Sequence, residues 1–343
     1  MIPSGSSSVF GSSGDLEESS LESLMKSGII RYGKKGRMQS DSQLDFAMDF
    51  DVVIPVHNRI APLQRAIQSV LEQELAASRI IIVDDASTID LREVKEWAME
   101  AGCRWKRLGR NAGPAEARNR GVDEGESRWI AFLDSDDTWS RGKLSLQAEW
   151  IAGNPESRIS QVRERWIREG REVKKPSHWE PREGDLFEQS CQRCSIGPSC
   201  VAIRRDLWAE TGGFDARYRV CEDYQLWLRI TKSEPVGLVP GLPQVDKHGG
   251  HEDQLSSLVP AMDRFRVLAL LELLAESGLS LKQRATACSA VKEKARILAD
   301  GAAKRGMLQR AELYAAIDTL DLGGVSSSLR ALVSALWTEV LSA

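Results

Sequence analysis

Long apolar runs are missing from this 343-residue sequence, and no stretch approaches the roughly 20 apolar residues that span a bilayer. An excess of basic residues is also missing. The 46 Lys and Arg stand against 50 Asp and Glu, and the net charge of −4 gives no electrostatic case for nucleic-acid binding. Six cysteines are too few for a dense disulfide framework and fit a reducing compartment. Neither a G-x-x-x-x-G-K-[ST] motif nor a strand-linked G-x-G-x-x-G occurs, which excludes the usual NTPase and dinucleotide-binding interpretations.

The first 48 residues contain little that could build a core. Twelve serines fall within the first fifty residues, with few aromatics and no lasting hydrophobic period, so we expect residues 1–48 to form a disordered tail. No charged segment precedes an apolar one, and we expect no secretory signal. A serine-rich start would suit an organellar transit peptide, but its acidic residues argue against one. We expect a soluble, cytoplasmic protein, with organellar targeting as the open alternative.

From residue 51 onwards, short apolar runs alternate with amphipathic segments. The runs DVVIPV (51–56), RIIIVDD (79–85) and RWIAFL (128–133) predict buried strands. Apolar positions 63, 67, 70 and 71 predict a helix that Asn58 would cap, and further helices are expected at 89–100 and 114–124. Strands that alternate with helices indicate an α/β fold with a parallel sheet.

Polar side chains follow three of these predicted strands. His57 and Asn58 follow the first, DDAST (84–88) the second and DSDD (134–137) the third. Ligands of such sheets bind beyond the carboxyl ends of the strands, so we expect these groups to form one site. Crowded carboxylates need a positive partner, and hard cations such as Mg²⁺ and Mn²⁺ prefer carboxylate and phosphate oxygens. The alternative is that residues 134–137 only end a strand and cap a helix near Ser140.

The second half of the chain predicts a hairpin and then helices. QVRERWIREGREVK (161–174) indicates two short strands around a turn at Glu169-Gly170. Hydrophobic periodicity predicts helices at 261–278, 281–304 and 307–319, and a last helix with an apolar stripe. That stripe could dock on the domain, pair with a partner or lie on a membrane, and its scarcity of Lys and Arg disfavours the membrane.

Six motifs then occur in sequence: VVIPVHNR, IIIVDDAST, NAGPAEARNRG, WIAFLDSDDTW, GGFD and CEDYQLWLR. Together they resemble the family 2 glycosyltransferases of the GT-A fold, in a bacterial-type branch. The resemblance implies a Rossmann-like, nucleotide-sugar-binding domain over residues 49–255, followed by a helical C-terminal extension at 256–343. It also implies a metal-dependent, inverting transfer of a sugar from a nucleotide sugar, with a UDP-sugar favoured, to an acceptor hydroxyl. The acceptor (glycan, lipid or protein) and any homo-oligomeric state stay open.

The resemblance assigns the donor side of the site to residues at strand ends. The implied nucleotide- and donor-binding residues are Pro55, His57, Asn58, Asp84, Asp85, Arg118, Asn119, Asp134 and Ser135. Asp136 is the implied metal ligand, with Asp134 beside it, and the cation would be Mn²⁺ or Mg²⁺. Of the two histidines in KHGGHEDQLS, His251 is favoured over His248 as a further ligand.

On the acceptor side, the resemblance makes Asp223 the base that takes the proton of the acceptor hydroxyl. Glu222 is expected to assist in orientation, and Trp139 could line the site, although core packing is its default role. Without the upstream motifs, Glu222 and Asp223 would be interpreted as ordinary acidic residues at a helix N-terminus.

Two other classes of protein fit parts of the sequence. IIIVDD, followed by Asp134 and later by Lys175-Pro176, resembles a phospho-receiver signalling domain, but this interpretation leaves VVIPVHNR, GGFD and CEDYQLWLR unexplained. The other alternative is a GT-A fold without catalysis that serves as a binding module. Cys191 and Cys194 form a C-x-x-C pair without the second ligand pair of a zinc site, so buried cysteines are expected.

Overall fold

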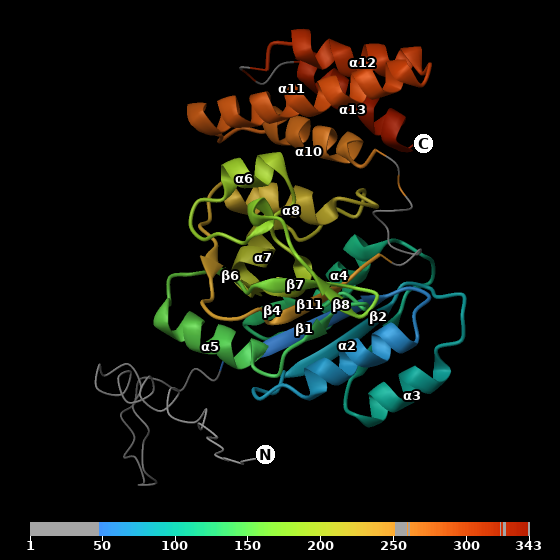
Figure 1. Cartoon of the computed structure of the whole chain (residues 1–343), viewed down its shortest axis with the longest axis vertical. Helices are drawn as coiled ribbons and strands as arrows, with labels where there is room; N and C mark the ends of the chain where they lie inside the picture. Colours follow the sequence, from blue (N-terminus) through green and yellow to red (C-terminus); the bar gives the residue numbers. More distant parts are fainter. Residues whose placement is uncertain (1–47, 251–258, 260, 323, 325–326, 342–343) are drawn as a thin grey trace, which may run out of the picture. The chain divides into compact units, whose positions relative to one another are not determined.

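A seven-stranded sheet forms the centre of the computed structural model, which describes residues 48–250, 259, 261–322, 324 and 327–341 (Figure 1). The strand order is β10-β6-β9-β4-β1-β2-β3. Strands β1 to β4 run parallel, whereas β9 runs antiparallel to both β4 and β6. The strands are β1 (Phe50–Val56), β2 (Arg79–Asp84), β3 (Arg104–Arg107), β4 (Trp129–Phe132), β6 (Ile159–Gln161), β9 (Val201–Arg204) and β10 (Gly237–Leu238). The predicted α/β class is confirmed.

Side chains of β1 alternate between two layers of helices. The even-numbered residues of β1 pack into one apolar cluster, and Val53 packs into another on the opposite face of the sheet. The first layer consists of α2 (Ala61–Leu71), α3 (Arg92–Glu100) and α5 (Lys143–Gly153). The second layer consists of α4 (Pro114–Asp123), α7 (Arg205–Thr211) and α8 (Glu222–Thr231). Cover on both faces explains why every residue of β1 is buried, and it leaves the carboxyl edge of the sheet as the expected ligand site.

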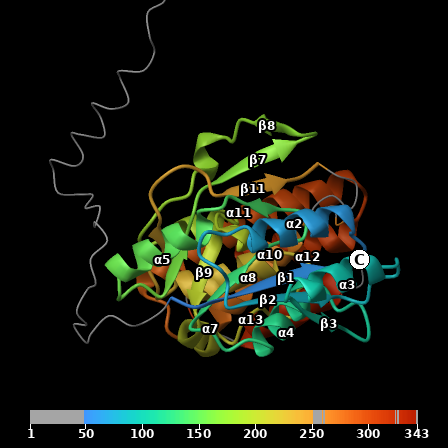
Figure 2. The same ribbon diagram turned by 90° about the horizontal axis from the view of Figure 1, so that it is seen from below.

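A second sheet of four strands adjoins the turn that carries the acidic residues. Its order is β5 (Thr138–Trp139), β11 (Val245–His248), β7 (Glu164–Arg168) and β8 (Arg171–Val173). Strands β7 and β8 form the predicted hairpin. Glu169 and Gly170 between them both have positive φ angles, 50° and 74°, as a two-residue hairpin turn requires. Figure 2 shows this hairpin at the margin of the ribbon.

Helices form the C-terminal part of the chain, as predicted. They are α10 (Asp263–Ala275), α11 (Leu281–Lys304), α12 (Leu308–Thr319) and α13 (Ser327–Leu341), and they contact α6 (Phe187–Gln192) and α8 (Figure 1). The predicted stripe of α13 docks within the chain, because Leu329, Leu336 and Val340 are buried in a cluster shared with α8 and α10. Residues 48–343 form one compact unit. None of the helices in the described ranges combines the length and apolar composition needed to cross a bilayer.

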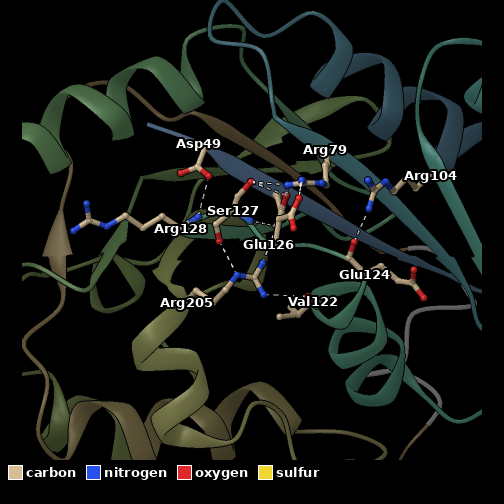
Figure 3. Close-up of polar contacts among 10 residues, drawn as sticks. Asp49, Arg79, Arg104, Val122, Glu124, Glu126, Ser127, Arg128 and Arg205 are labelled. Carbon is tan, nitrogen blue, oxygen red and sulfur yellow. Dashed lines mark hydrogen bonds and ion pairs between the residues drawn. The ribbon is translucent and has the colours of Figure 1, made fainter. Parts of the chain in front are cut away.

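A buried carboxylate ties several elements together at the amino-terminal end of the strands. Figure 3 shows three residues that contact it, Arg79, Ser127 and Arg205. Asp51 has no solvent exposure, and it accepts hydrogen bonds from the main-chain nitrogen and the Oγ of Ser127, both at 2.7 Å. Arg205 donates to the same carboxylate at 2.7 Å, and Arg79 lies 3.3 Å from it. Arg205 also donates to the main-chain oxygens of Val122 and Ser127. This network lies opposite the carboxyl edge of the sheet and stabilises the fold.

Several local predictions are wrong. Asn58 does not cap α2, which begins at Ala61 without a side-chain cap. The Oδ1 of Asn58 instead accepts from the main-chain nitrogen of Thr88 at 2.7 Å. Leu71 is 36% exposed and lies outside the buried stripe of α2, and the helix expected from residue 89 begins at residue 92. The predicted N-terminal tail lies, apart from residue 48, outside the described residues.

Candidate active site

The end of β1 presents His57 in a fixed orientation. Its Nδ1 lies 2.8 Å from the main-chain oxygen of Asp85, so this nitrogen carries the proton and donates. The amide nitrogens of Asn58 and Asn111 each lie 3.1 Å from Nε2, which accepts. Three hydrogen bonds fix the plane of this half-buried imidazole ring. A ring that is to stack on a nucleobase needs such a fixed orientation.

The two aspartates at the end of β2 have different partners. Asp84 accepts from a main-chain nitrogen of its own turn at 2.8 Å and pairs with Arg107, so it shapes the turn. Asp85 accepts from the main-chain nitrogens of Ala112 and Gly113 at 2.7 and 2.8 Å, just before α4. Each oxygen of Asp85 keeps a second lone pair for a further donor. Asp85 is thus the better candidate for a contact with a nucleobase.

The three carboxylates after β4 are in different electrostatic states. Asp136 pairs with Arg59 at 2.9 Å. Burial alone would raise the pKa of Asp134, but Arg118, which donates to it at 2.6 Å, lowers that pKa below its ordinary value. Burial, followed by the charges of Asp134 and Asp136, raises the pKa of Asp137 well above its ordinary value. Two arginines are therefore positive partners of this acidic turn, and Asp137 is the member whose ionised form burial disfavours.

Arg118 joins the acidic turn to the start of α8. Its guanidinium is buried, with Nη2 donating to Asp134 at 2.6 Å and Nη1 donating to Glu222 at 2.7 Å. The ring of Phe214 lies 5.1 Å from the guanidinium carbon and adds a cation–π contact. Burial raises the pKa of Glu222 to about 7, against the opposing charge of Arg118. The DSDD turn and the CEDYQLWLR motif therefore belong to one site.

Asp223 lies in the first turn of α8 and faces a thiol. Its Oδ2 lies 3.2 Å from Cys194 Sγ, which donates, and its Oδ1 accepts from the main-chain nitrogen of Tyr224 at 2.6 Å. Burial and the charge of Asp223 raise the pKa of Cys194 well above its ordinary value, so the thiol keeps its proton. Cys221, just before the helix, has a φ of 61°, a left-handed conformation that is costly for a residue with a Cβ. The carboxylate is thus held by two donors at a strained helix start.

Four other predicted site residues are placed as follows. Asn119 exchanges hydrogen bonds of 2.8 and 3.0 Å with the main chain of Phe214 and so holds the GGFD loop. Trp139 is 5% exposed, and its Nε1 donates to a main-chain oxygen at 2.9 Å, which agrees with core packing rather than with a contact to an acceptor. Pro55 is buried within β1, and Ser135 is buried in the acidic turn. Roles of Asn119, Pro55 and Ser135 in donor binding stay predictions.

His248 lies on β11 beside the acidic turn. Its main-chain nitrogen donates to Asp137 at 3.1 Å, its Nε2 lies 3.5 Å from Thr138 Oγ1, and burial lowers its pKa. His251, the favoured histidine, lies outside the described residues. Within the described ranges, no group of three or more His, Cys, Asp or Glu side chains is arranged to hold a metal. Asp134 and Asp136 do offer what Mg²⁺ commonly uses, namely one or two carboxylates completed by phosphate and water oxygens.

Sequence reasoning missed two residues of this region. The sequence predicts Cys194 only as a buried cysteine of a C-x-x-C pair, and no local signal places it against Asp223. Lys247 lies among carboxylates, where Glu164, followed by Asp137, raises its pKa above the ordinary value. The alternation in VDKH (245–248) could have placed Lys247 on the same face of β11 as the buried Val245.

The strand order, the acidic turn and the carboxylate at a helix start define an α/β domain of the GT-A type. Residues 51–211 match the model of glycosyl transferase family 2. The chain therefore carries a family 2 glycosyltransferase domain, as the six motifs predicted. This result excludes the phospho-receiver alternative. In agreement, Lys175 donates to a main-chain oxygen of the second sheet.

Known proteins resemble the chain in this region. An uncharacterized glycosyltransferase of Rickettsia felis is 33% identical over 190 residues, which cover 54% of this chain and 31% of the relative. The E. coli protein WfgD, a UDP-Glc:alpha-D-GlcNAc-diphosphoundecaprenol beta-1,3-glucosyltransferase, is 29% identical over 55% of this chain and 72% of its own length. This chain spans about a third of the length of the Rickettsia relatives that it matches. Residues 1–349 of S. aureus TarS, solved with UDP-GlcNAc, share the fold with a TM-score of 0.57 at 15% identity, over 78% of this chain and 90% of that one.

Proposed function

We propose that this chain is a metal-dependent, inverting glycosyltransferase that moves a sugar from a nucleotide sugar, with a UDP-sugar favoured, to an acceptor hydroxyl. The observation that carries the proposal is the bridge of Arg118 between Asp134 and Glu222, because it joins a donor-side acid to the helix start that carries the candidate base Asp223. The name of WfgD specifies a UDP-sugar, and the TarS structure contains UDP-GlcNAc, which supports the choice of nucleotide.

On the donor side, the proposal gives each strand end a task. His57 stacks on the base, whose polar edge hydrogen-bonds to Asp85. Asp134 and Asp136 would hold Mn²⁺ or Mg²⁺, which when bound acts as a Lewis acid on the charge that develops on the leaving diphosphate. Arg118 keeps Asp134 ionised and oriented, as a metal ligand requires.

On the acceptor side, Asp223 takes the proton of the attacking hydroxyl. Its two hydrogen bonds, from Cys194 and from the main chain, fix the carboxylate in one orientation. A single base suffices for an inverting transfer, whereas a glycosidase needs an acid and a base on either side of the bond. Glu222 lies one residue away, buried against Arg118, and positions the helix start.

Hydrolysis and transfer should be measured across a panel of nucleotide sugars with Mn²⁺ or Mg²⁺. Asp223→Asn should bind UDP like the wild type, by calorimetry, but lose at least about a hundredfold in turnover, because only the proton transfer is removed. Asp136→Ala should weaken metal-dependent UDP binding, with the exposed Asp123→Asn as control. Transfer by Asp223→Asn at the wild-type rate would refute the base assignment. Binding of UDP without turnover of any donor by the wild type would favour the non-catalytic binding module.

A further inference from the structure

Two tryptophans do not belong to the hydrophobic cores of the described structure. Eight of the ten tryptophans pack in or against the three large apolar clusters. The two that do not are Trp166 on β7 and Trp179 in the short helix η1 (Ser177–Trp179), both half-buried. Their rings lie 6.0 Å apart, tilted by 59°. An aromatic pair that contributes to no core and stays partly open is a candidate for a binding surface.

Trp166 points to the same side of the second sheet as the candidate site. Alternation along β7 puts Glu164 and Trp166 on one face, and Nε1 of Trp166 donates to Glu164 at 2.7 Å. Trp166 is registered with Lys247 of β11, so their side chains share that face. Lys247 in turn interacts electrostatically with Asp137 and Asp134 of the acidic turn. Trp166 therefore lies on the site side of the hairpin.

Trp179 is connected to the candidate base through α6. The guanidinium of Arg193, the residue that ends α6, lies 5.9 Å from the ring centre of Trp179. The next residue, Cys194, contacts Asp223 at 3.2 Å. Among the described residues, the guanidinium of Arg193 has no hydrogen-bond or ion-pair partner, and its Nε is buried without one. Arg193 thus offers unused donors beside Trp179.

We propose that Trp166, Trp179 and Arg193 form an acceptor subsite for a saccharide. This inference rests on the proposed function and deepens it, because it selects a glycan among glycan, lipid and protein acceptors. The C–H face of a pyranose ring packs on an indole ring, while its hydroxyl groups accept hydrogen bonds from a guanidinium. In this proposal, a saccharide that rests on the tryptophan pair presents a further hydroxyl to Asp223. The hydrocarbon of a lipid chain would leave the donors of Arg193 unused, and a peptide lacks the C–H face of a pyranose ring that packs on the indole rings.

The test uses the full chain with UDP and Mn²⁺ on a printed array of oligosaccharides that covers the common pyranoses. Wild type should bind at least one saccharide, and Trp166→Ala and Trp179→Ala should each lower that binding about tenfold. Trp179→Phe, which keeps an aromatic face, should stay within about threefold of the wild type, whereas Trp179→Leu should behave like Trp179→Ala. UDP binding, measured by calorimetry, should be the same in all variants. Binding to phosphatidylcholine–phosphatidylglycerol vesicles and to a peptide array is measured in parallel, to test a lipid or a protein as the acceptor.

Several outcomes would overturn the subsite. They are UDP binding without any saccharide bound, saccharide binding that both alanine variants retain, and vesicle or peptide binding that the tryptophan substitutions abolish. Equal saccharide binding by Trp179→Leu and Trp179→Phe would also count against the subsite, because an apolar side chain without an aromatic face would then suffice. Failure of the wild type to bind UDP is a separate result, which would count against the proposed nucleotide-sugar function itself.

Discussion

Replacement of Glu222 by Gln should make the protein more stable at high pH, although it removes a charge that is paired with Arg118. Burial raises the pKa of Glu222 from 4.5 to about 7. One pKa unit corresponds to about 1.4 kcal/mol, so ionisation of Glu222 in the folded state costs about 3 kcal/mol relative to the unfolded chain. Gln keeps an oxygen that can accept from Arg118 but cannot ionise.

The sign of the effect follows from proton binding. Between pH 4.5 and pH 7 the folded state holds a proton on Glu222 that the unfolded state has released, so the unfolding free energy of the wild type falls as pH rises. Below pH 4.5 the carboxyl is neutral in both states, and wild type and Glu222→Gln should have similar stability. Above pH 4.5 the unfolding free energy of the variant should increasingly exceed that of the wild type, by about 3 kcal/mol at pH 8.

Urea unfolding, followed by circular dichroism at pH 5, 6, 7 and 8, measures this difference. The urea concentrations at the unfolding midpoints convert to free energies of unfolding if the dependence of the free energy on urea concentration is the same in the two proteins. Groups distant from Glu222 titrate equally in both proteins, so the difference curve reports Glu222 together with the neighbours that interact with its charge, Arg118 and Asp223. The exposed Glu183→Gln controls for the substitution itself. A difference that does not change with pH, or a variant that loses stability as pH rises, would refute the reasoning.

Two further predictions concern the base and the fold. Cys194→Ala removes a donor that orients Asp223, which should lower the rate of transfer about tenfold, and Cys194→Ser should restore that rate. An unchanged rate in Cys194→Ala would show that the thiol does not orient the base. Asp51→Ala leaves Arg205 without its buried carboxylate and should cost about 3–5 kcal/mol in urea unfolding. A loss of unfolding free energy below about 1 kcal/mol would show that the Asp51 network does not stabilise that edge of the sheet.

Elements with a local signal were predictable from the sequence. The apolar runs of β1, β2 and β4 and the periodicity of α11 and α12 place them within a few residues of their observed bounds. The hairpin followed from Glu169-Gly170, because few residue pairs adopt two successive positive φ angles. Asn58 shows the limit of such signals. It is a good cap residue, but its side chain finds stronger partners at Thr88, across the site.

Contacts between distant segments had no signal in the sequence. Arg118 could be interpreted as a residue near the diphosphate, but not as a bridge to a glutamate 104 positions away. The thiol against Asp223 depends on the path of the chain after α6, which no periodicity describes. Electrostatic states were equally hidden, since the three acids of one turn differ through burial, through the charges around them and through which arginine each one meets.

The C-terminal helices bear on catalysis because they hold the helix that carries the base. Apolar side chains of α8 pack in two directions. Leu226, Trp227 and Ile230 pack toward the sheet, and Tyr224 and Leu228 pack into the cluster of α10 to α13. A helix with apolar side chains on both faces needs cover on both sides. Among the described residues, α6, the segment before α8 and the helices after residue 260 supply the second side. The predicted boundary at residue 255 therefore separates segments of the sequence but not the core that positions Asp223.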